Sequence, residues 1–459
     1  MKEPLIKSCK TLEKLINSLK VINQGRFRPI GGFSIDSRSL KKGDCFIALY
    51  GRHHDGHNFI SQAITNGASC VISQKNIQSV SKVPVFVVKD SYAPLEELVR
   101  YIREIKNPFV FAITGSVGKT TTKEMLSFIL EGRFKVLKNE KTENNILGVA
   151  KTILSLTDQE MLVLELGTNA PGEIERLARM CMPDVGIITF IKAVHLEGLK
   201  SLKGIRKEKT ALLKSNPRMR AVLNGDDPLL GGLNSNKRTY WFGRAKTNNL
   251  WAQILKLGQR SCEFTVKNKF RLTLGVPFEG FIYNALAAMQ GAQLANIPLK
   301  DSLARMNRFK GFPALRMEFK ENKGYAVLND AYNANPYSLK EALNTVKRYP
   351  QKKIAVIADM LELGKKSAYY HQSLASPILR CKFEYVLTLG DYTFYLDKRL
   401  KELGCNNAFH FSSQKELAQF IKDKFSETKL NENQEQKGWL IFLKGSRKME
   451  LEKITEYLG

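Results

Sequence analysis

A glycine loop followed by lysine and threonine is the stretch of this chain whose residue types could most directly do chemistry. Residues 108–130 read PFVFAITGSVGKTTTKEMLSFIL: an apolar run, a turn through glycines, then apolar residues at helical spacing. A strand, a glycine loop and a helix N-terminus form a phosphate cradle, because backbone N–H groups and the helix end supply positive potential. Lys119 is expected to reach the terminal phosphates of a nucleotide, and the Thr120 hydroxyl to face Mg²⁺. The residues expected to bind the nucleotide here are Thr114, Gly115, Ser116, Val117, Gly118, Lys119, Thr120 and Thr121.

Two further polar residues accompany apolar runs of the kind that form buried strands. Glu165 stands near the end of the run 161–167, and His195 follows the run 184–191. Helical patterns separate these runs and a third at 221–227, which describes an open parallel sheet that binds ligands at the carboxyl ends of its strands. Thr120, Glu165 and His195 could therefore converge on one metal–phosphate site, where oxygen ligands with one imidazole suit Mg²⁺ or Mn²⁺ better than Zn²⁺. A surface carboxylate and an ordinary loop histidine are the alternatives for Glu165 and His195.

The net charge of +28 on 459 residues limits the kinds of binding partner that we expect. The basic residues are spread throughout, without a long basic block or an aromatic-interleaved basic motif, so we expect no nucleic acid partner. A polyphosphate substrate would explain part of the charge equally well. A basic nucleotide-dependent nucleic-acid-binding protein is kept as the alternative from a different functional class.

Hydropathy and cysteine content limit the cellular compartments in which we expect the protein. No apolar run approaches the roughly 18 residues that span a bilayer, so no membrane insertion is expected. The first residues, MKEPLIKSCKTLEKLINSLK, lack a continuous apolar core and a small-residue cleavage site, so we do not expect a signal peptide. The seven cysteines are scattered and no CxxC occurs, which favours reduced thiols in a cytoplasm and argues against a metal cluster.

The chain is too long for one core and its patterns divide it into three α/β units, at 1–106, 107–310 and 311–459. In the first unit, strands are predicted at 45–49, 70–72 and 84–88, and helices at 10–19, 59–66 and 92–105. In the second, alternation over 236–275 predicts an antiparallel appendage, followed by a helix at 284–295. In the third, strands at 325–330, 352–359, 385–391 and 439–446 predict a doubly wound sheet, with an exposed loop at 427–437.

Two loops of the first unit carry polar residues that could serve a ligand. The loop Ser34–Arg38, reading SIDSR, could hold a phosphate or a base edge, or could be a simple turn. The histidines at 53, 54 and 57 lie beside Asp55 but lack cysteine or acidic partners at ligand spacing. A polar loop lining a substrate site is therefore preferred to a metal site.

These motifs together resemble those of the Mur ligases of peptidoglycan synthesis, over nearly the whole chain. The shortened glycine loop, with Ile113 where the usual phosphate loop begins with glycine, is the form found in that family. The resemblance rests on IDSR at 35–38, GDCFIAL at 43–49, DGHNF at 55–59, TGSVGKTTTKEM at 114–125, NNILG at 144–148, ELGTNAPGEI at 165–174, HLEGLKSL at 195–202, NGDD at 224–227, NALAA at 284–288, DAYNANPYS at 330–338, DMLELG at 359–364 and KGSRKME at 444–450.

The resemblance implies three domains and an ATP-dependent reaction. A smaller α/β N-terminal domain would bind a UDP-linked substrate, a central P-loop-type parallel sheet would bind ATP, and a C-terminal Rossmann-like domain would close on ATP. The reaction implied is phosphorylation of a carboxylate, followed by attack of an amine on the acyl phosphate. DAYNANP and KGSR favour the member that joins D-Ala-D-Ala to UDP-N-acetylmuramoyl-tripeptide. A monomer is expected. The alternatives are the diaminopimelate- or lysine-adding Mur ligases and folylpolyglutamate synthase.

The resemblance also implies roles for single residues. Lys119 would clamp the γ-phosphate, Thr120 and Glu165 one Mg²⁺, and His195 a second. Lys209 would be carbamylated, becoming a carboxylate that ligates or supports metal, and Arg206 and Lys207 would lower the pKa of its amine. The remaining expected residues are Asn284, Arg316, Asp330 and Asn333 for ATP; Ser34, Asp36, Ser37 and Arg38 for UDP; Asn145, Thr168 and Asn169 for the muramoyl-peptide or the γ-phosphate region; Tyr332 and Asn335 at the closing interface; and Lys444, Ser446 and Arg447 for the dipeptide.

The chain departs from the pattern of that family in three places. Gly280 and Phe281 stand where it usually has His-Asn, which bears on adenine binding. Leu315 stands where a glycine usually precedes the arginine of the third domain, and Ala211 where a glutamate follows the modified lysine.

Overall fold

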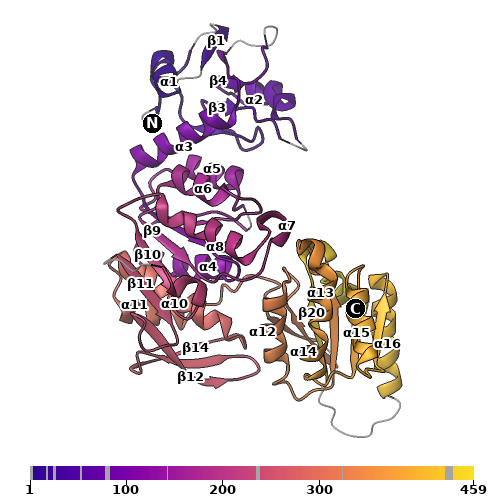
Figure 1. Cartoon of the computed structure of the whole chain (residues 1–459). Helices are drawn as coiled ribbons and strands as arrows, with labels where there is room; N and C mark the ends of the chain where they lie inside the picture. The colour runs from indigo at the N-terminus through magenta and orange to yellow at the C-terminus, as the bar shows by residue number, and fades with distance from the viewer. Residues whose placement is uncertain are drawn as a thin grey trace.

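Three β-sheets follow one another along the chain, each covered by helices (Figure 1). The structure is a computed structural model and describes residues 4–16, 19–23, 27–51, 54–77, 83–141, 143–233, 238–322, 324–429 and 438–459. In Figure 1 the first unit, in indigo, lies above the central unit, in magenta, and the third, in orange and yellow, lies beside the central unit. The predicted α/β architecture with mostly parallel sheets is confirmed.

The first sheet has the strand order β1-β5-β4-β3-β2, with β1 antiparallel at its edge and the other strands parallel. Its elements are α1 (Cys9–Leu15), β1 (Lys20–Asn23), β2 (Phe33–Ser34), β3 (Cys45–Ile47), α2 (Ile60–Thr65), β4 (Cys70–Ser73), β5 (Val85–Val87) and α3 (Tyr92–Lys106). Helix α3 forms because its buried apolar residues recur at helical spacing, and it ends where Asn107 adopts a left-handed conformation. The helix predicted at 10–19 is shorter than expected, because Ile16 is already extended.

The central sheet has the order β14-β13-β12-β11-β10-β9-β6-β8-β7. Its strands are parallel from β7 to β12, and β13 and β14 add an antiparallel extension. The elements are β6 (Phe109–Thr114), α4 (Lys119–Leu130), β7 (Val136–Lys138), α5 (Ile146–Leu154), β8 (Met161–Glu165), α6 (Glu173–Cys181), β9 (Val185–Ile188), α7 (Leu196–Leu199), α8 (Leu202–Thr210), β10 (Arg220–Asn224), α9 (Pro228–Gly231), β11 (Thr239–Gly243), β12 (Leu250–Leu257), β13 (Cys262–Val266), β14 (Phe270–Leu274), α10 (Gly280–Leu294) and α11 (Leu299–Met306).

The antiparallel appendage predicted at 236–275 is correct for β12 to β14 and wrong for β11, which pairs in parallel with β10. The feature of this sheet that matters for function is the position of β6. It lies between β8 and β9, which follow it in the chain but flank it on opposite sides. A crevice opens at the carboxyl edge of a parallel sheet where successive connections diverge in this way.

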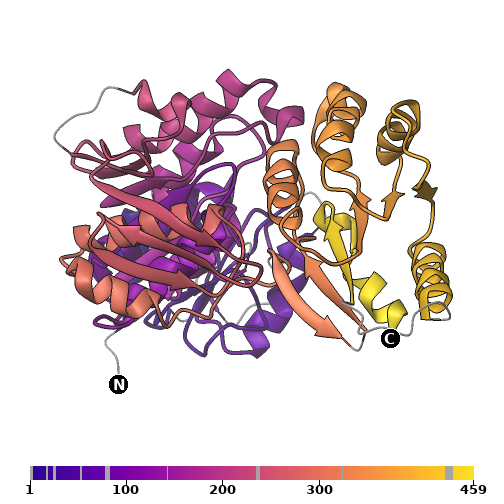
Figure 2. The same ribbon diagram turned by 90° about the horizontal axis from the view of Figure 1, so that it is seen from below.

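The third sheet has the order β15-β16-β20-β17-β18-β19, parallel except for β15 at one edge. Helices flank its strands, as Figure 2 shows. The elements are β15 (Glu318–Asn322), β16 (Tyr325–Asn329), α12 (Pro336–Val346), β17 (Lys353–Ala358), α13 (Ser367–Gln372), α14 (Ala375–Leu379), β18 (Tyr385–Leu389), α15 (Thr393–Glu402), β19 (Ala408–Phe411), α16 (Gln414–Lys429), β20 (Trp439–Lys444) and α17 (Lys453–Leu458).

All four strands predicted for the third unit are present. The loop predicted at 427–437 is only partly testable, because α16 extends to Lys429 and residues 430–437 lie outside the described residues. Within the described ranges, no helix has the length and apolar character needed to cross a bilayer.

Candidate functional site

Three neighbouring strands bring the predicted phosphate and metal residues to one edge of the central sheet. Ile113 of β6 pairs with Glu165, the last residue of β8, and β9 lies on the other side of β6. The glycine loop and α4 follow β6 directly, and the chain beyond β9 leads to His195. Lys119, Glu165 and His195 consequently line one cavity of about 480 Å³.

The glycines of the loop allow close approach to neighbouring elements. Gly118 has a φ of 87°, and a Cβ added there would lie 2.3 Å from Asn284 Oδ1. A Cβ at Gly115 would lie 2.0 Å from the hydroxyl of Thr189. Lys119 Nζ folds back and donates to the carbonyl oxygen of Gly115 at 2.9 Å. The loop therefore has the close backbone packing and cationic side chain of a phosphate cradle.

Glu165 is held as a buried carboxylate with one free oxygen. Its side chain is 2% exposed, and Oε1 accepts a 2.9 Å hydrogen bond from Asn144 Nδ2. The side chain of Asn139 fixes its backbone, accepting from Glu165 N at 2.8 Å and donating to Glu165 O at 3.0 Å. Oε2 is buried and has no hydrogen-bond partner. A buried, unpartnered carboxylate oxygen is costly unless a cation occupies the place beside it, so this geometry fits a metal ligand.

A side chain of the third unit reaches the glycine loop. Arg316 donates from its guanidinium to Thr120 Oγ1 at 3.2 Å, and the same group lies 4.0 Å from the centre of the Tyr332 ring. Its Nε is buried without a partner. Leu315 has a φ of 58°, a left-handed conformation that glycine adopts at lower cost. This accounts physically for the glycine that the resembling family usually carries there.

His195 meets a carboxylate from the third unit. Its Nδ1 lies 2.5 Å from Glu362 Oε2, and the N–H of Glu197 donates to the carbonyl oxygen of Glu362 at 3.2 Å. The hydrogen bond with His195 lowers the pKa of the Glu362 carboxyl, and Lys448 and Lys119 act in the same direction. The sequence analysis did not single out Glu362, because its position depends on how two units pack.

Lys209 on α8 is almost completely enclosed, with 1% of its surface exposed. Burial lowers the pKa of its amine well below the ordinary value, and the charge of Lys119 lowers it further, against the opposing effect of Glu208 and Glu165. The charges of Lys119 and Glu165 thus act on the Lys209 amine, although Lys209 does not itself line the cavity. A neutral amine is the form that can react with carbon dioxide.

The predicted cause of this low pKa was wrong. Arg206 and Lys207 were expected to depress it, but neither acts on Lys209. Arg206 turns its Nε to the carbonyl oxygen of Leu229 at 2.7 Å, and Lys207 is exposed. Burial, which the sequence does not reveal for a lysine in a charged helix, is the main cause.

Histidine, cysteine and acidic side chains alone do not build a metal cluster here. Among the described residues, no group of three such side chains is close enough to hold an ion. Glu165 and His195 are two of the predicted ligands, and a third would have to come from Thr120 or from a modified Lys209. The predicted set is therefore chemically consistent with a hard cation that keeps other oxygen ligands.

Two of the predicted substrate residues, Asn145 and Thr168, have structural contacts and do not line the cavity, whereas a neighbour of each does. Asn145 caps α5 by accepting from Gly148 N at 3.0 Å, and Asn144 is the asparagine that lines the cavity. Thr168 is buried and contacts Glu208 Oε1 at 3.2 Å, while Asn169 lines the cavity. Which of two adjacent polar residues turns inward is not visible in the sequence.

The end of the cavity beside Asn284 is aromatic. Phe278, Phe281 and Tyr283 line it together with Gly280. Gly280 and Phe281, which stand where the family usually has His-Asn, therefore belong to this wall. Flat apolar side chains of this kind suit a purine ring.

Three motif residues of the third unit, Asp330, Asn333 and Lys444, form one hydrogen-bonded group. Lys444 Nζ lies 2.7 Å from Asp330 Oδ2 and donates to Asn333 O at 2.7 Å. Burial lowers the pKa of the Lys444 amine. Ser446 Oγ accepts from Leu361 N at 2.9 Å. Other motif residues are also engaged: Asn335 and Ser338 form the capping box of α12, and Arg447 pairs with Glu452. All of the predicted third-unit residues line the cavity: Arg316, Asp330, Tyr332, Asn333, Asn335, Lys444, Ser446 and Arg447.

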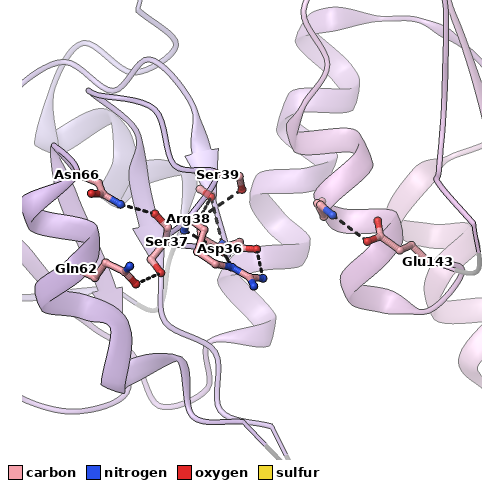
Figure 3. A network of polar contacts seen from close by, with 9 residues as sticks. Asp36, Ser37, Arg38, Ser39, Gln62, Asn66 and Glu143 are labelled. Carbon is pink, nitrogen blue, oxygen red and sulfur yellow. Dashed lines mark hydrogen bonds and ion pairs between the residues drawn. The ribbon is translucent and has the colours of Figure 1, made fainter.

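The SIDSR loop lies apart from this cavity and is internally ordered (Figure 3). Arg38 forms a two-pronged contact with Asp36, at 2.9 and 2.8 Å, and lowers the pKa of the Asp36 carboxyl. Ser37 donates to Gln62 Oε1 at 2.8 Å, and Ser34 donates to the carbonyl oxygen of Asp36 at 2.9 Å. Figure 3 shows Glu143 across from this loop, where it pairs with Lys151 of α5. The loop thus faces the central unit.

No metal site is found among the described residues of the histidine loop. His57 is buried, with Nδ1 2.5 Å from Asp55 Oδ1 and Nε2 accepting from Gln74 N at 3.0 Å. Both ring nitrogens are therefore used within the fold. His53 lies outside the described residues.

Three family models match consecutive parts of the chain. Residues 29–110 match "Mur ligase family, catalytic domain", residues 113–292 match "Mur ligase middle domain", and residues 315–446 match "Mur ligase, glutamate ligase domain". Together these matches extend over most of the chain.

Similar proteins include two bacterial UDP-N-acetylmuramoyl-tripeptide–D-alanyl-D-alanine ligases. The protein from Bacillus subtilis is 31% identical over 439 residues, which cover 94% of this chain and 93% of that protein. The protein from Rickettsia prowazekii is 32% identical over 438 residues, covering 92% and 94%.

Solved structures agree with these matches. The crystal structure of MurF from Acinetobacter baumannii has a TM-score of 0.87 and 27% identity, covering 99% of each chain. MurF from Thermotoga maritima in complex with ADP has a TM-score of 0.80 and 25% identity, covering 93% of this chain and 96% of that one.

Proposed function

Because this chain belongs to the Mur ligase family, we propose that it joins D-Ala-D-Ala to UDP-N-acetylmuramoyl-tripeptide, using ATP and releasing ADP and phosphate. The observation that carries the proposal is the cavity in which a phosphate loop, a buried free carboxylate oxygen and an arginine from another unit meet. ATP fits this cavity, with the loop for its phosphates and the aromatic wall beside Asn284 for its base.

The reaction must bring two anions together, because a carboxylate attacks the γ-phosphate of ATP. Charge neutralisation therefore matters more than a strong nucleophile. Lys119 and Arg316 supply positive charge from two sides of the glycine loop. Glu165 and Thr120 would hold one Mg²⁺ and His195 a second, and Mg²⁺ when bound would offset the phosphate charge.

The phosphorylated carboxylate then becomes an acyl phosphate. The amine of D-Ala-D-Ala, once it has lost the proton of its ammonium form to solvent, attacks the carbonyl carbon. The new C–N bond forms, the C–O bond to phosphate breaks, phosphate leaves with the former carboxylate oxygen, and the nitrogen releases a second proton. Lys209 is proposed to be carbamylated, since its burial favours the neutral amine that this modification requires. Its carbamate would place a second negative group near that of Glu165.

The other predicted assignments stand as parts of this proposal. Ser34, Asp36, Ser37 and Arg38 would bind UDP, and Asn169 would face the peptide end of the substrate. The units 1–106, 107–310 and 311–459 would bind the UDP-linked substrate, ATP and the dipeptide respectively. We also propose a monomer that works in the cytoplasm without a nucleic acid partner.

A substrate-omission assay tests the proposal. Phosphate release should require ATP, UDP-N-acetylmuramoyl-tripeptide and D-Ala-D-Ala together, and mass spectrometry should find the UDP-linked pentapeptide. Tripeptides that differ in their third residue identify the preferred substrate. Turnover with diaminopimelate, lysine or glutamate in place of the dipeptide would favour the alternative ligases, and salt-dependent binding of RNA or DNA without such turnover would favour the nucleic-acid alternative.

A further inference from the structure

Two oppositely charged side chains of the third unit face the cavity beside the glycine loop. Glu362 and Lys448 both line it, and both are exposed. The loops that carry them are joined, because Leu361 N donates to Ser446 Oγ at 2.9 Å and Ser446 N donates to Asp359 O at 3.0 Å. Lys448 is near enough to help lower the pKa of the Glu362 carboxyl.

Most other charged groups that this unit contributes to the cavity are already engaged. Asp330 and Lys444 pair with each other, and Arg447 pairs with Glu452. Arg316 is directed to Thr120 of the phosphate loop. Within the described part of the chain, Lys448 has no ion pair within 4 Å, and Glu362 uses only Oε2, for His195.

The position of Glu362 is next to the reacting groups. It contacts His195, and its charge partly offsets the lowering of the Lys119 pKa by burial, so it lies near the end of the cavity where the γ-phosphate would be presented. Glu362 also has a φ of 65°, a conformation that non-glycine residues adopt at a cost and that is concentrated at functional sites. A free carboxylate oxygen is thus placed beside the site of acyl transfer.

We propose that Glu362 and Lys448 bind the two charged ends of the incoming dipeptide. D-Ala-D-Ala is a zwitterion, with an ammonium group at one end and a carboxylate at the other. Glu362 Oε1 would accept a hydrogen bond from the ammonium, which places the nitrogen beside the acyl phosphate, and Lys448 would bind the distant carboxylate. This inference rests on the proposed function and adds the residues that select its second substrate.

Steady-state kinetics of Glu362→Gln and Lys448→Gln test the inference. Loss of a charge-assisted hydrogen bond should raise the KM for D-Ala-D-Ala by about ten- to a hundredfold, with the KM for ATP and tripeptide unchanged. Formation of the acyl phosphate in the absence of dipeptide, trapped with hydroxylamine, should remain at the wild-type rate in both variants. Glu416→Gln and Lys365→Gln, which remove the same charges from exposed positions of the third unit outside the cavity lining, should leave all these values unchanged.

A substrate analogue tests the two ends of the dipeptide separately. Wild-type enzyme should prefer D-Ala-D-Ala to its C-terminal amide, and Lys448→Gln should lose this preference while Glu362→Gln keeps it. An unchanged KM for the dipeptide in Glu362→Gln, with slower acyl-phosphate formation, would assign Glu362 to His195 and overturn the inference. A Lys448→Gln variant that still prefers D-Ala-D-Ala to its C-terminal amide as strongly as wild type would also overturn the inference. If wild-type enzyme itself forms neither acyl phosphate nor product, the proposed function fails rather than this assignment.

Discussion

The guanidinium of Arg316 lies 3.2 Å from the hydroxyl of Thr120, although the two residues belong to different sheets of the molecule. Thr120 is the residue that follows the lysine of the phosphate loop, so the third unit completes the site that the central unit begins. The contact also places a cation where negative charge would collect on a nucleotide. Chemistry in this cavity should therefore depend on a side chain that does not belong to the nucleotide-binding sheet.

Replacing Arg316 should impair turnover more than folding. Arg316→Ala should lower kcat by about a hundredfold or more, the usual cost of losing one donor that stabilises developing charge. Arg316→Lys should recover only part of this, because an ammonium lacks the planar fork that can contact Thr120 and stack on Tyr332 together. Arg399→Ala, which removes an exposed arginine paired with Glu402, is the control and should match wild type. Equal activity of Arg316→Ala and the control would refute a role for Arg316 at the phosphates.

Gly118 and Gly172 allow a matched test of the phosphate loop. Both have left-handed conformations, with φ of 87° and 88°, but only Gly118 has a neighbour where a Cβ would stand. Each alanine variant should lose about 1–2 kcal/mol of stability from backbone strain. Gly118→Ala should in addition push the loop away from Asn284 and weaken ADP binding about tenfold, measured by titration calorimetry. Equal ADP affinity in the two variants would mean that the close approach to Asn284 is not needed for binding.

Lys209 should make stability depend on pH. Its folded pKa lies well below the ordinary 10.5, so between these two values the unfolded chain binds more protons than the folded one. The free energy of unfolding should rise with pH across that window, and Lys209→Met should flatten the rise. Urea unfolding at a series of pH values in carbon-dioxide-free buffer measures the difference. If the free energy of unfolding changes with pH in the same way in both proteins, the pKa of the buried amine is not lowered in the folded state.

Removing the Lys209 amine should also create an enzyme that depends on added carboxylates. Lys209→Ala should lose most activity, and short-chain carboxylic acids should restore part of it by occupying the place of the carbamate. Wild-type enzyme supplied with ¹³C-bicarbonate should show a carbamate carbon by NMR. Near-normal activity of the variant without any rescue would make Lys209 an ordinary buried lysine.

Elements whose structure is determined by local pattern could be predicted from the sequence. The run at β6 and the glycines after it specify a strand, a loop and a helix within one stretch, and the structure has all three. The strand β15 was missed because most of its side chains are exposed and carry no apolar alternation, so it exists through its pairing with β16. Strand β11 was misassigned because alternation does not reveal whether its partner runs parallel.

The same distinction between local pattern and packing applies to the functional site. Glu165 and His195 could be predicted because the carboxyl ends of neighbouring parallel strands meet at one edge. Glu362 could not, since it reaches His195 only through the packing of the third unit against the central one. The enclosure of Lys209 likewise depends on packing around α8, which the charged sequence of that helix does not reveal.

The central claim is that the glycine loop presents a γ-phosphate to a carboxylate, and the fate of one oxygen atom tests it most directly. UDP-N-acetylmuramoyl-tripeptide labelled with ¹⁸O in its terminal carboxylate is incubated with ATP, D-Ala-D-Ala and the enzyme, with Lys119→Ala as the inactive control. The acyl-phosphate route predicts that the released phosphate carries ¹⁸O, because the carboxylate oxygen that attacked phosphorus leaves with it. Peptide bond formation with phosphate free of the label would contradict the account.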